Sequence, residues 1–173
     1  MGWKNVKEHY KIVHIVQVND KGICIGSSYI HDLMVISPKG ELLKRPSRVN
    51  ADLSRYETEM DADPEELAQL VVKPDVFEQF ITVYTYDEGK IIAKQCEAPG
   101  WPHVTHDGSM MYDNTYSTDK MQVVEWAKQD ARAGIKLTQR SLAQRRQEIC
   151  DSEARLLGFE RSLSTLEAEY PRP

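Results

Sequence analysis

Residues 118–170 read TDKMQVVEWAKQDARAGIKLTQRSLAQRRQEICDSEARLLGFERSLSTLEAEY, and this stretch decides the architecture of the chain. It holds no proline from Thr118 to Glu169, and Ser117 or Thr118 is placed to cap a helix that Asp119 would also favour. A continuous helix of this length spans about 78 Å at ~1.5 Å per residue. One ordinary domain cannot cover it along its length, so part of it is expected to project or to pair.

Apolar side chains recur along this helix at a spacing of seven. The series is Ile135, Leu142, Ile149, Leu156, Leu163 and Tyr170. The companion positions are weaker, with polar residues in the middle: Val124, Ala131, Thr138, Arg145, Ser152, Phe159 and Leu166. A strict seven-residue repeat favours a left-handed coiled coil. We therefore predict a homodimer or higher oligomer whose seam contains Ile135, Leu142, Ile149, Leu156, Phe159, Leu163 and Leu166.

Two glycines bear on whether this helix is continuous. Gly134 and Gly158 each destabilise a helix interior by about 1 kcal/mol relative to alanine. Gly134 could instead end a first helix and convert the segment into a helical hairpin. No loop-forming residues accompany either glycine, which favours a largely continuous helix.

Charge is unevenly distributed along the chain. From Asn50 to Gly89 eleven acids oppose only Arg55 and Lys73, a net charge of −9, whereas Lys128 to Arg146 carries six bases against Asp130, a net charge of +5. Four of these bases form a stripe at a spacing of four: Lys128, Arg132, Lys136 and Arg140. The stripe is a candidate surface for an acidic protein or an anionic ligand, or a solvated helix face. Nucleic acid is possible but not favoured, because the chain is acidic overall and carries no nucleic-acid motif.

The first part of the chain predicts short antiparallel strands. Tyr10–Val18 is rich in β-branched residues, Asn19–Gly22 has turn chemistry, and Ile23–Ile25 begins a second strand. Leu33–Ile36 and Glu41–Lys44 extend this pattern into a meander.

Two short helices and further strands are expected next. Asn50 is a good N-cap for a helix that buries Leu53, Tyr56 and Met60; Asp63 caps a second helix that begins at Pro64 and ends at Lys73-Pro74. Strands over Phe77–Tyr86 and Ile91–Cys96 follow, and Asp107-Gly108 is a hairpin turn.

Together these patterns indicate an α+β protein. We expect a mostly antiparallel sheet body with two short inserted helices over residues 1–117, and a long C-terminal helix able to form a coiled coil over 118–170. The three cysteines form no close pair, the first residues lack an apolar block, and no run is long enough to span a membrane. A cytoplasmic protein without a cofactor is therefore predicted.

The loop from Gly100 to Tyr116 is rich in aromatic and polar residues. Trp101, Tyr112 and Tyr116 are candidates to contact a protein partner or an anionic ligand, as aromatic residues often do. Alternatively, Trp101 and Tyr112 pack the base of the long helix against the sheet.

His103, His106 and Asp107 are weak candidates for a metal site. A divalent metal needs three or four converging ligands. On a strand, however, a spacing of three places the two histidines on opposite faces, and Asp107 is already explained as a turn residue. No P-loop, dinucleotide fingerprint or nucleophile elbow is present.

The segment Gly100-Trp101-Pro102-His103 through Asp107-Gly108, with Tyr112-Asp113-Asn114-Thr115 and the helix after it, resembles small accessory proteins of phages and mobile elements. That resemblance implies a protein that acts stoichiometrically on host machinery, such as an inhibitor of a host defence system. We therefore expect a non-catalytic protein-binding module that self-associates through its C-terminal helix. The alternatives are a binder of a small anionic, nucleotide-like ligand and a metal-dependent hydrolase.

Overall fold

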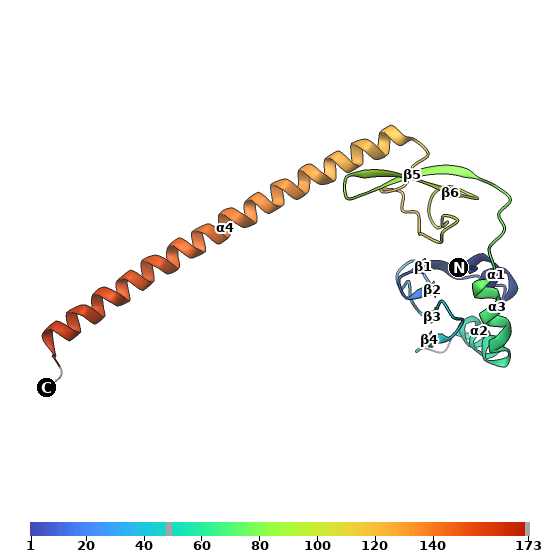
Figure 1. Ribbon diagram of the computed structural model, residues 1–173, viewed down its shortest axis with the longest axis horizontal. Coiled ribbons are helices and arrows are strands. Elements are labelled where there is room, and N and C mark those ends of the chain that lie inside the picture. Colours follow the sequence, from blue (N-terminus) through green and yellow to red (C-terminus); the bar gives the residue numbers. More distant parts are fainter. Residues whose placement is uncertain (48–49, 172–173) are drawn as a thin grey trace. The chain divides into compact units, whose positions relative to one another are not determined.

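The computed structural model describes residues 1–47 and 50–171 of the chain (Figure 1). Among these residues, the fold is α+β, as the sequence predicted, with one long C-terminal helix. The helices are α1 (Trp3–His9), α2 (Ala51–Ala62), α3 (Pro64–Val72) and α4 (Lys120–Glu169). The strands are β1 (Ile15–Asn19), β2 (Gly22–Gly26), β3 (Met34–Ile36), β4 (Leu42–Lys44), β5 (Ile81–Asp87) and β6 (Lys90–Cys96). The chain divides into two compact units, Met1–Trp126 and Ala127–Pro173.

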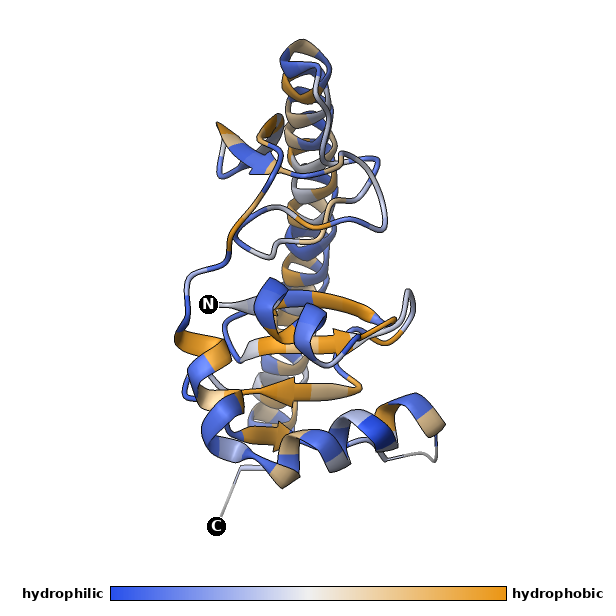
Figure 2. Ribbon diagram, turned by 90° about the vertical axis from the view of Figure 1, so that its right-hand side faces the viewer, coloured by the Kyte–Doolittle hydropathy of each residue, from blue (hydrophilic) through white to orange (hydrophobic). Residues whose placement is uncertain are grey.

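The first unit contains the predicted antiparallel meander, in the order β1-β2-β3-β4. The β1–β2 register runs from the Ile15–Gly26 pair to the Asn19–Gly22 pair, where the tight turn closes the hairpin. Every residue of β2 and β3 is buried. Figure 2 shows the corresponding apolar colouring on the sheet strands, whereas α2 is largely hydrophilic in colour.

A helix that the sequence did not predict precedes the sheet. α1 buries Trp3 and Val6, and Tyr10 follows on the same side. The strand expected from Tyr10 begins only at Ile15, because the chain first turns at Lys11, whose φ is +48°. The beginning of that prediction was therefore wrong.

Helices α2 and α3 begin where the sequence predicted. The Asn50 side chain accepts hydrogen bonds from the amides of Asp52 and Leu53, and Asp63 accepts one from the amide of Glu66. Their buried residues join α1 and the sheet in the main core, in which Tyr56 is fully buried.

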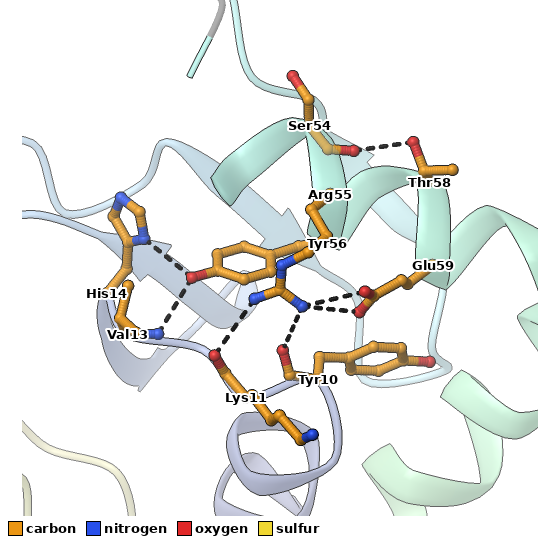
Figure 3. A network of polar contacts seen from close by, with 9 residues as sticks. All are labelled: Tyr10, Lys11, Val13, His14, Ser54, Arg55, Tyr56, Thr58 and Glu59. Carbon is orange, nitrogen blue, oxygen red and sulfur yellow. Dashed lines mark hydrogen bonds and ion pairs between the residues drawn. The ribbon is translucent and has the colours of Figure 1, made fainter. Parts of the chain in front are cut away.

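Tyr56 and its neighbour Arg55 connect α2 to the segment between α1 and β1 (Figure 3). The Tyr56 hydroxyl accepts a hydrogen bond from the Val13 amide at 3.0 Å and lies 3.3 Å from Nδ1 of His14. The Arg55 guanidinium donates to the Tyr10 carbonyl at 3.1 Å and to the Glu59 carboxylate at 3.0 Å. The bonds to the Val13 amide and the Tyr10 carbonyl satisfy backbone groups that form no hydrogen bond with a neighbouring strand.

Replacing Tyr56 by phenylalanine is expected to lower the free energy of unfolding by about 1–2 kcal/mol, because it removes a buried hydroxyl and takes away the acceptor of the Val13 amide. Urea denaturation followed by tryptophan fluorescence measures the change. Tyr29→Phe is the matched control, since Tyr29 is 92% exposed and should change stability by less than ~0.5 kcal/mol. Equal effects of the two substitutions would contradict this role of the hydroxyl.

The hairpin β5–β6 forms the second sheet and carries a small core of its own. Val83, Cys96 and Met111 are buried there, with Ile81 and Tyr116 packed against them. The turn at Asp107-Gly108 is present, although only isolated bridges flank it and no full strands form. The Gly108 carbonyl accepts a hydrogen bond from the Val18 amide at 2.8 Å, which joins this turn to β1.

Helix α4 runs unbroken through Gly134 and Gly158, so the helical-hairpin alternative was wrong. A Cβ added at either glycine would meet nothing within 4 Å. The capping residue is Asp119, whose carboxylate accepts from the Met121 amide at 2.8 Å, rather than Ser117 or Thr118. Within the described residues, no helix combines the length and the apolar character that crossing a membrane requires.

Candidate interaction surface

The principal candidate surface is the part of α4 in the second unit. Every residue from Lys128 to Tyr170 is exposed, including all six apolar residues of the seven-residue repeat. We call these six the leading series: Ile135, Leu142, Ile149, Leu156, Leu163 and Tyr170. Their exposed fractions lie between 49% and 73%. The apolar side chains of this repeat are therefore exposed along the helix.

A second series lies three or four residues from members of the leading series, so the two share one face of the helix. It comprises Ala131, Thr138, Arg145, Ser152, Phe159 and Leu166. Phe159 is 73% exposed and Leu166 55% exposed. The combined face, which we call the seam, is apolar toward its C-terminal end and partly polar toward its middle.

The exposed seam is energetically significant. Full burial of one Leu, Ile or Phe side chain contributes about 1.5–3 kcal/mol. If each apolar side chain of the seam contributed only half of this burial energy, the sum over two helices would still be comparable with the ~4–15 kcal/mol that association costs. Exposed apolar surfaces bordered by polar residues mark interaction sites in other proteins.

The basic stripe and the aromatic loop residues lie in different units of the chain. Lys128, Arg132, Lys136 and Arg140 are exposed on α4, in the second unit. In the first unit, Trp101 is 47% and Tyr112 40% exposed, whereas half-buried Tyr116 packs on the core of the β5–β6 hairpin. Trp101 and Tyr112 thus remain candidate contact residues, and Tyr116 has a packing role.

The side chain of His106 packs against two aromatic rings. Its ring stacks on Phe77 at 3.8 Å between centroids, with an interplanar angle of 4°, and Phe80 lies edge-on at 5.0 Å. The His106 carbonyl accepts a hydrogen bond from Nε1 of Trp3 at 3.0 Å, which ties α1 to this loop. His103, by contrast, is exposed.

The Asp107 carboxylate pairs with Nζ of Lys94 at 2.8 Å and accepts a hydrogen bond from the Thr105 hydroxyl. Over residues 1–47 and 50–171, no group of three or more His, Cys, Asp or Glu side chains is placed to hold a metal ion. The three weak metal candidates are therefore not brought together as a ligand set.

The Lys94–Asp107 pair predicts a pH dependence of stability. Partial burial would raise the pKa of Asp107, but the Lys94 ammonium and the Thr105 hydroxyl outweigh it and lower that pKa from 3.8 to about 2. The stabilisation is therefore present above the ordinary pKa of 3.8 and is lost as the pH falls through about 2. Because Asp107 is more than half exposed, we expect Asp107→Asn to reduce the free energy of unfolding by only about 1 kcal/mol at pH 7.

Denaturant titrations between pH 2 and pH 7 measure this difference, which should shrink to a small part of its neutral-pH value near pH 2. Asp20→Asn, at an exposed position in the β1–β2 turn, is the control and should track the parent protein throughout. A difference between Asp107→Asn and the parent that is independent of pH would contradict the ion pair as its cause.

The first unit contains a cleft that no sequence pattern predicted. It has a volume of about 450 Å³ and is lined by residues of α1, the segment before β1, β1 and residues 97–104. Lys4, Lys7, Lys11 and His14 are among its lining residues, and Glu97 pairs with Lys4 at 2.7 Å. These residues are up to about a hundred positions apart, so no local motif marks the cleft.

Comparison of the chain with protein-family models, with curated proteins and with solved structures found no match.

Proposed function

We propose that this protein is a non-catalytic binding protein that self-associates through α4 and acts stoichiometrically on a protein partner. The observation that carries the proposal is the leading series, which stays exposed and in register from Ile135 to Tyr170. A second helix with the same repeat can bury this series by inserting its side chains between those of the first.

Self-association also explains the length of α4. An isolated helix depends on local propensity alone, and Gly134, Gly158 and several polar residues weaken that propensity here. Pairing along the seam supplies the tertiary stabilisation that most protein helices require. The first unit is then presented in more than one copy, which raises its avidity for a partner. A phage-borne inhibitor of a host defence system is one concrete version of this function.

Light scattering coupled to size-exclusion chromatography, over a wide range of concentrations, tests the self-association. We expect a mass of about twice or more the 19.9 kDa of one chain. A protein that stays monomeric up to ~100 μM would refute the proposal. For the partner, affinity capture followed by calorimetry on the purified pair should give a fixed ratio per chain and no turnover of either component.

A small anionic ligand in the cleft is the second candidate function. Lys7 and Lys11 line the cleft, and within residues 1–47 and 50–171 no carboxylate pairs with either ammonium group. Thermal denaturation with and without millimolar ATP or inorganic phosphate tests this candidate. A stabilising shift that disappears in Lys7→Glu/Lys11→Glu supports it, and the absence of any shift contradicts it.

A further inference from the structure

The exposed part of α4 is divided into two halves of opposite charge. Lys128 to Arg146 carries a net charge of +5. From Glu148 to Glu169, six acids (Glu148, Asp151, Glu153, Glu160, Glu167 and Glu169) oppose Arg155 and Arg161, a net charge of −4. A parallel pair of helices would place like halves together, whereas an antiparallel pair places each basic half beside an acidic half.

The seam shows the same preference. In a parallel pair in register, Arg145 would face the partner's Arg145 within the apolar interface. In an antiparallel pair, residues of the leading series face residues of the partner's second series. The reason is that the alternating spacing of three and four residues along the seam runs in opposite directions on the two helices. Each large apolar residue of the leading series therefore faces a member of the second series, and Arg145 faces an aliphatic side chain.

We propose that α4 pairs with a second copy in an antiparallel coiled coil in which the residue numbers of each facing pair add to 301. This inference rests on the proposed self-association and specifies its geometry. The facing pairs are Ala131–Tyr170, Ile135–Leu166, Thr138–Leu163, Leu142–Phe159, Arg145–Leu156 and Ile149–Ser152, each occurring twice. The overlap, residues 131–170, lies wholly within the exposed part of the helix.

The charges beside the seam select this register. Arg146 lies beside the partner's Glu153, Arg132 beside the partner's Glu167, and Glu148 beside the partner's Arg155. A shift of one heptad in one direction sets Arg146 against the partner's Arg146. The opposite shift sets Glu153 against the partner's Glu153. Like charges beside a coiled-coil seam are destabilising, so both neighbouring registers are disfavoured.

Disulfide trapping tests orientation and register together. Cys24 and Cys96 are buried, so replacing exposed Cys150 by serine gives a suitable background. In this background we would prepare Ile135→Cys, Leu166→Cys and Phe159→Cys singly, mix them in pairs and oxidise them. We expect Ile135→Cys with Leu166→Cys to give at least tenfold more mixed disulfide than Ile135→Cys with Phe159→Cys. The second combination would form a disulfide only in the register shifted by one heptad. Disulfides formed by each single variant with itself would indicate a parallel pair and overturn the inference.

Charge reversal provides a test with opposite signs for the two orientations. In the antiparallel pair, Glu153→Arg faces the partner's Arg146 and should weaken the dimer about tenfold, and adding Arg146→Glu should restore it. In a parallel pair Glu153 lies beside the partner's Glu148, so Glu153→Arg would strengthen the dimer and contradict the inference. Neither Arg146 nor Glu153 has a charged residue three or four positions away on its own helix, so the local effect of each substitution is small.

The mass of the Cys150→Ser protein, measured first by light scattering, separates the two proposals. A monomer would refute self-association itself. A dimer that forms the wrong disulfides, or that Glu153→Arg strengthens, would refute only the antiparallel geometry.

Discussion

Replacing Ile135 and Leu142 together by aspartate should leave the protein monomeric at concentrations where the parent protein associates. In the antiparallel register these side chains face the partner's Leu166 and Phe159, so the double substitution places four carboxylates in the most apolar layers of the seam. Each lost aliphatic side chain removes about 1.5–3 kcal/mol of burial. We therefore expect the dissociation constant to rise by a factor of at least ~100, as measured by sedimentation equilibrium.

The chain offers a matched control for this prediction. Leu137 and Leu157 are 70% and 53% exposed leucines of the same helix that belong to neither series of the seam. Leu137→Asp/Leu157→Asp introduces the same number of carboxylates on other faces and should change the dissociation constant by less than about threefold. Equal dissociation of both double variants would show that the seam is not the contact face.

The seam variant should also lose helical signal. A helix that is exposed on all sides keeps little stability once pairing is lost. Circular dichroism at 222 nm should therefore fall in Ile135→Asp/Leu142→Asp and depend on concentration in the parent protein. In a Trp101→Phe/Trp126→Phe background, the fluorescence of Trp3, buried in the core of the first unit, should stay unchanged and confirm that the body remains folded.

The elements that local chemistry determines could be predicted from sequence. Asn50 and Asp63 cap their helices because a short polar side chain can reach the free amides of the first turn. The strict repeat of seven likewise placed the leading series on one face of α4. Trp3, Val6 and Tyr10 carried the helical spacing of α1 as well, but the adjacent β-branched run obscured it.

Contacts between distant segments could not be predicted in this way. The stacking of His106 on Phe77 joins residues 29 positions apart, and the hydrogen bond from Trp3 to the His106 carbonyl spans 103 positions. No periodicity links such residues, because only the packing of Phe77 and the loop after β6 against α1 brings them together. The cleft next to α1 was missed for the same reason.

The second large effect is expected at Gly22, where the β1–β2 turn enters β2. Its φ is +129°, and a Cβ there would lie 2.1 Å from the carbonyl oxygen of Ile36 in β3. Gly22→Ala therefore combines backbone strain with a clash against a neighbouring strand that is itself buried. We expect the free energy of unfolding to fall by about 3 kcal/mol or more, measured by urea denaturation.

A substitution at Gly89, in the β5–β6 turn, distinguishes the effect of backbone strain from that of the steric clash. The φ of Gly89 is +78°, but a Cβ there would meet nothing within 4 Å. Gly89→Ala should therefore show the backbone strain alone, about 1–2 kcal/mol. The difference between the two variants measures how closely β2 and β3 approach at the Gly22 position. If Gly22→Ala were no less stable than Gly89→Ala, the strand register at Ile36 would have to differ from the one described, since a backbone oxygen at 2.1 Å cannot yield without moving β3.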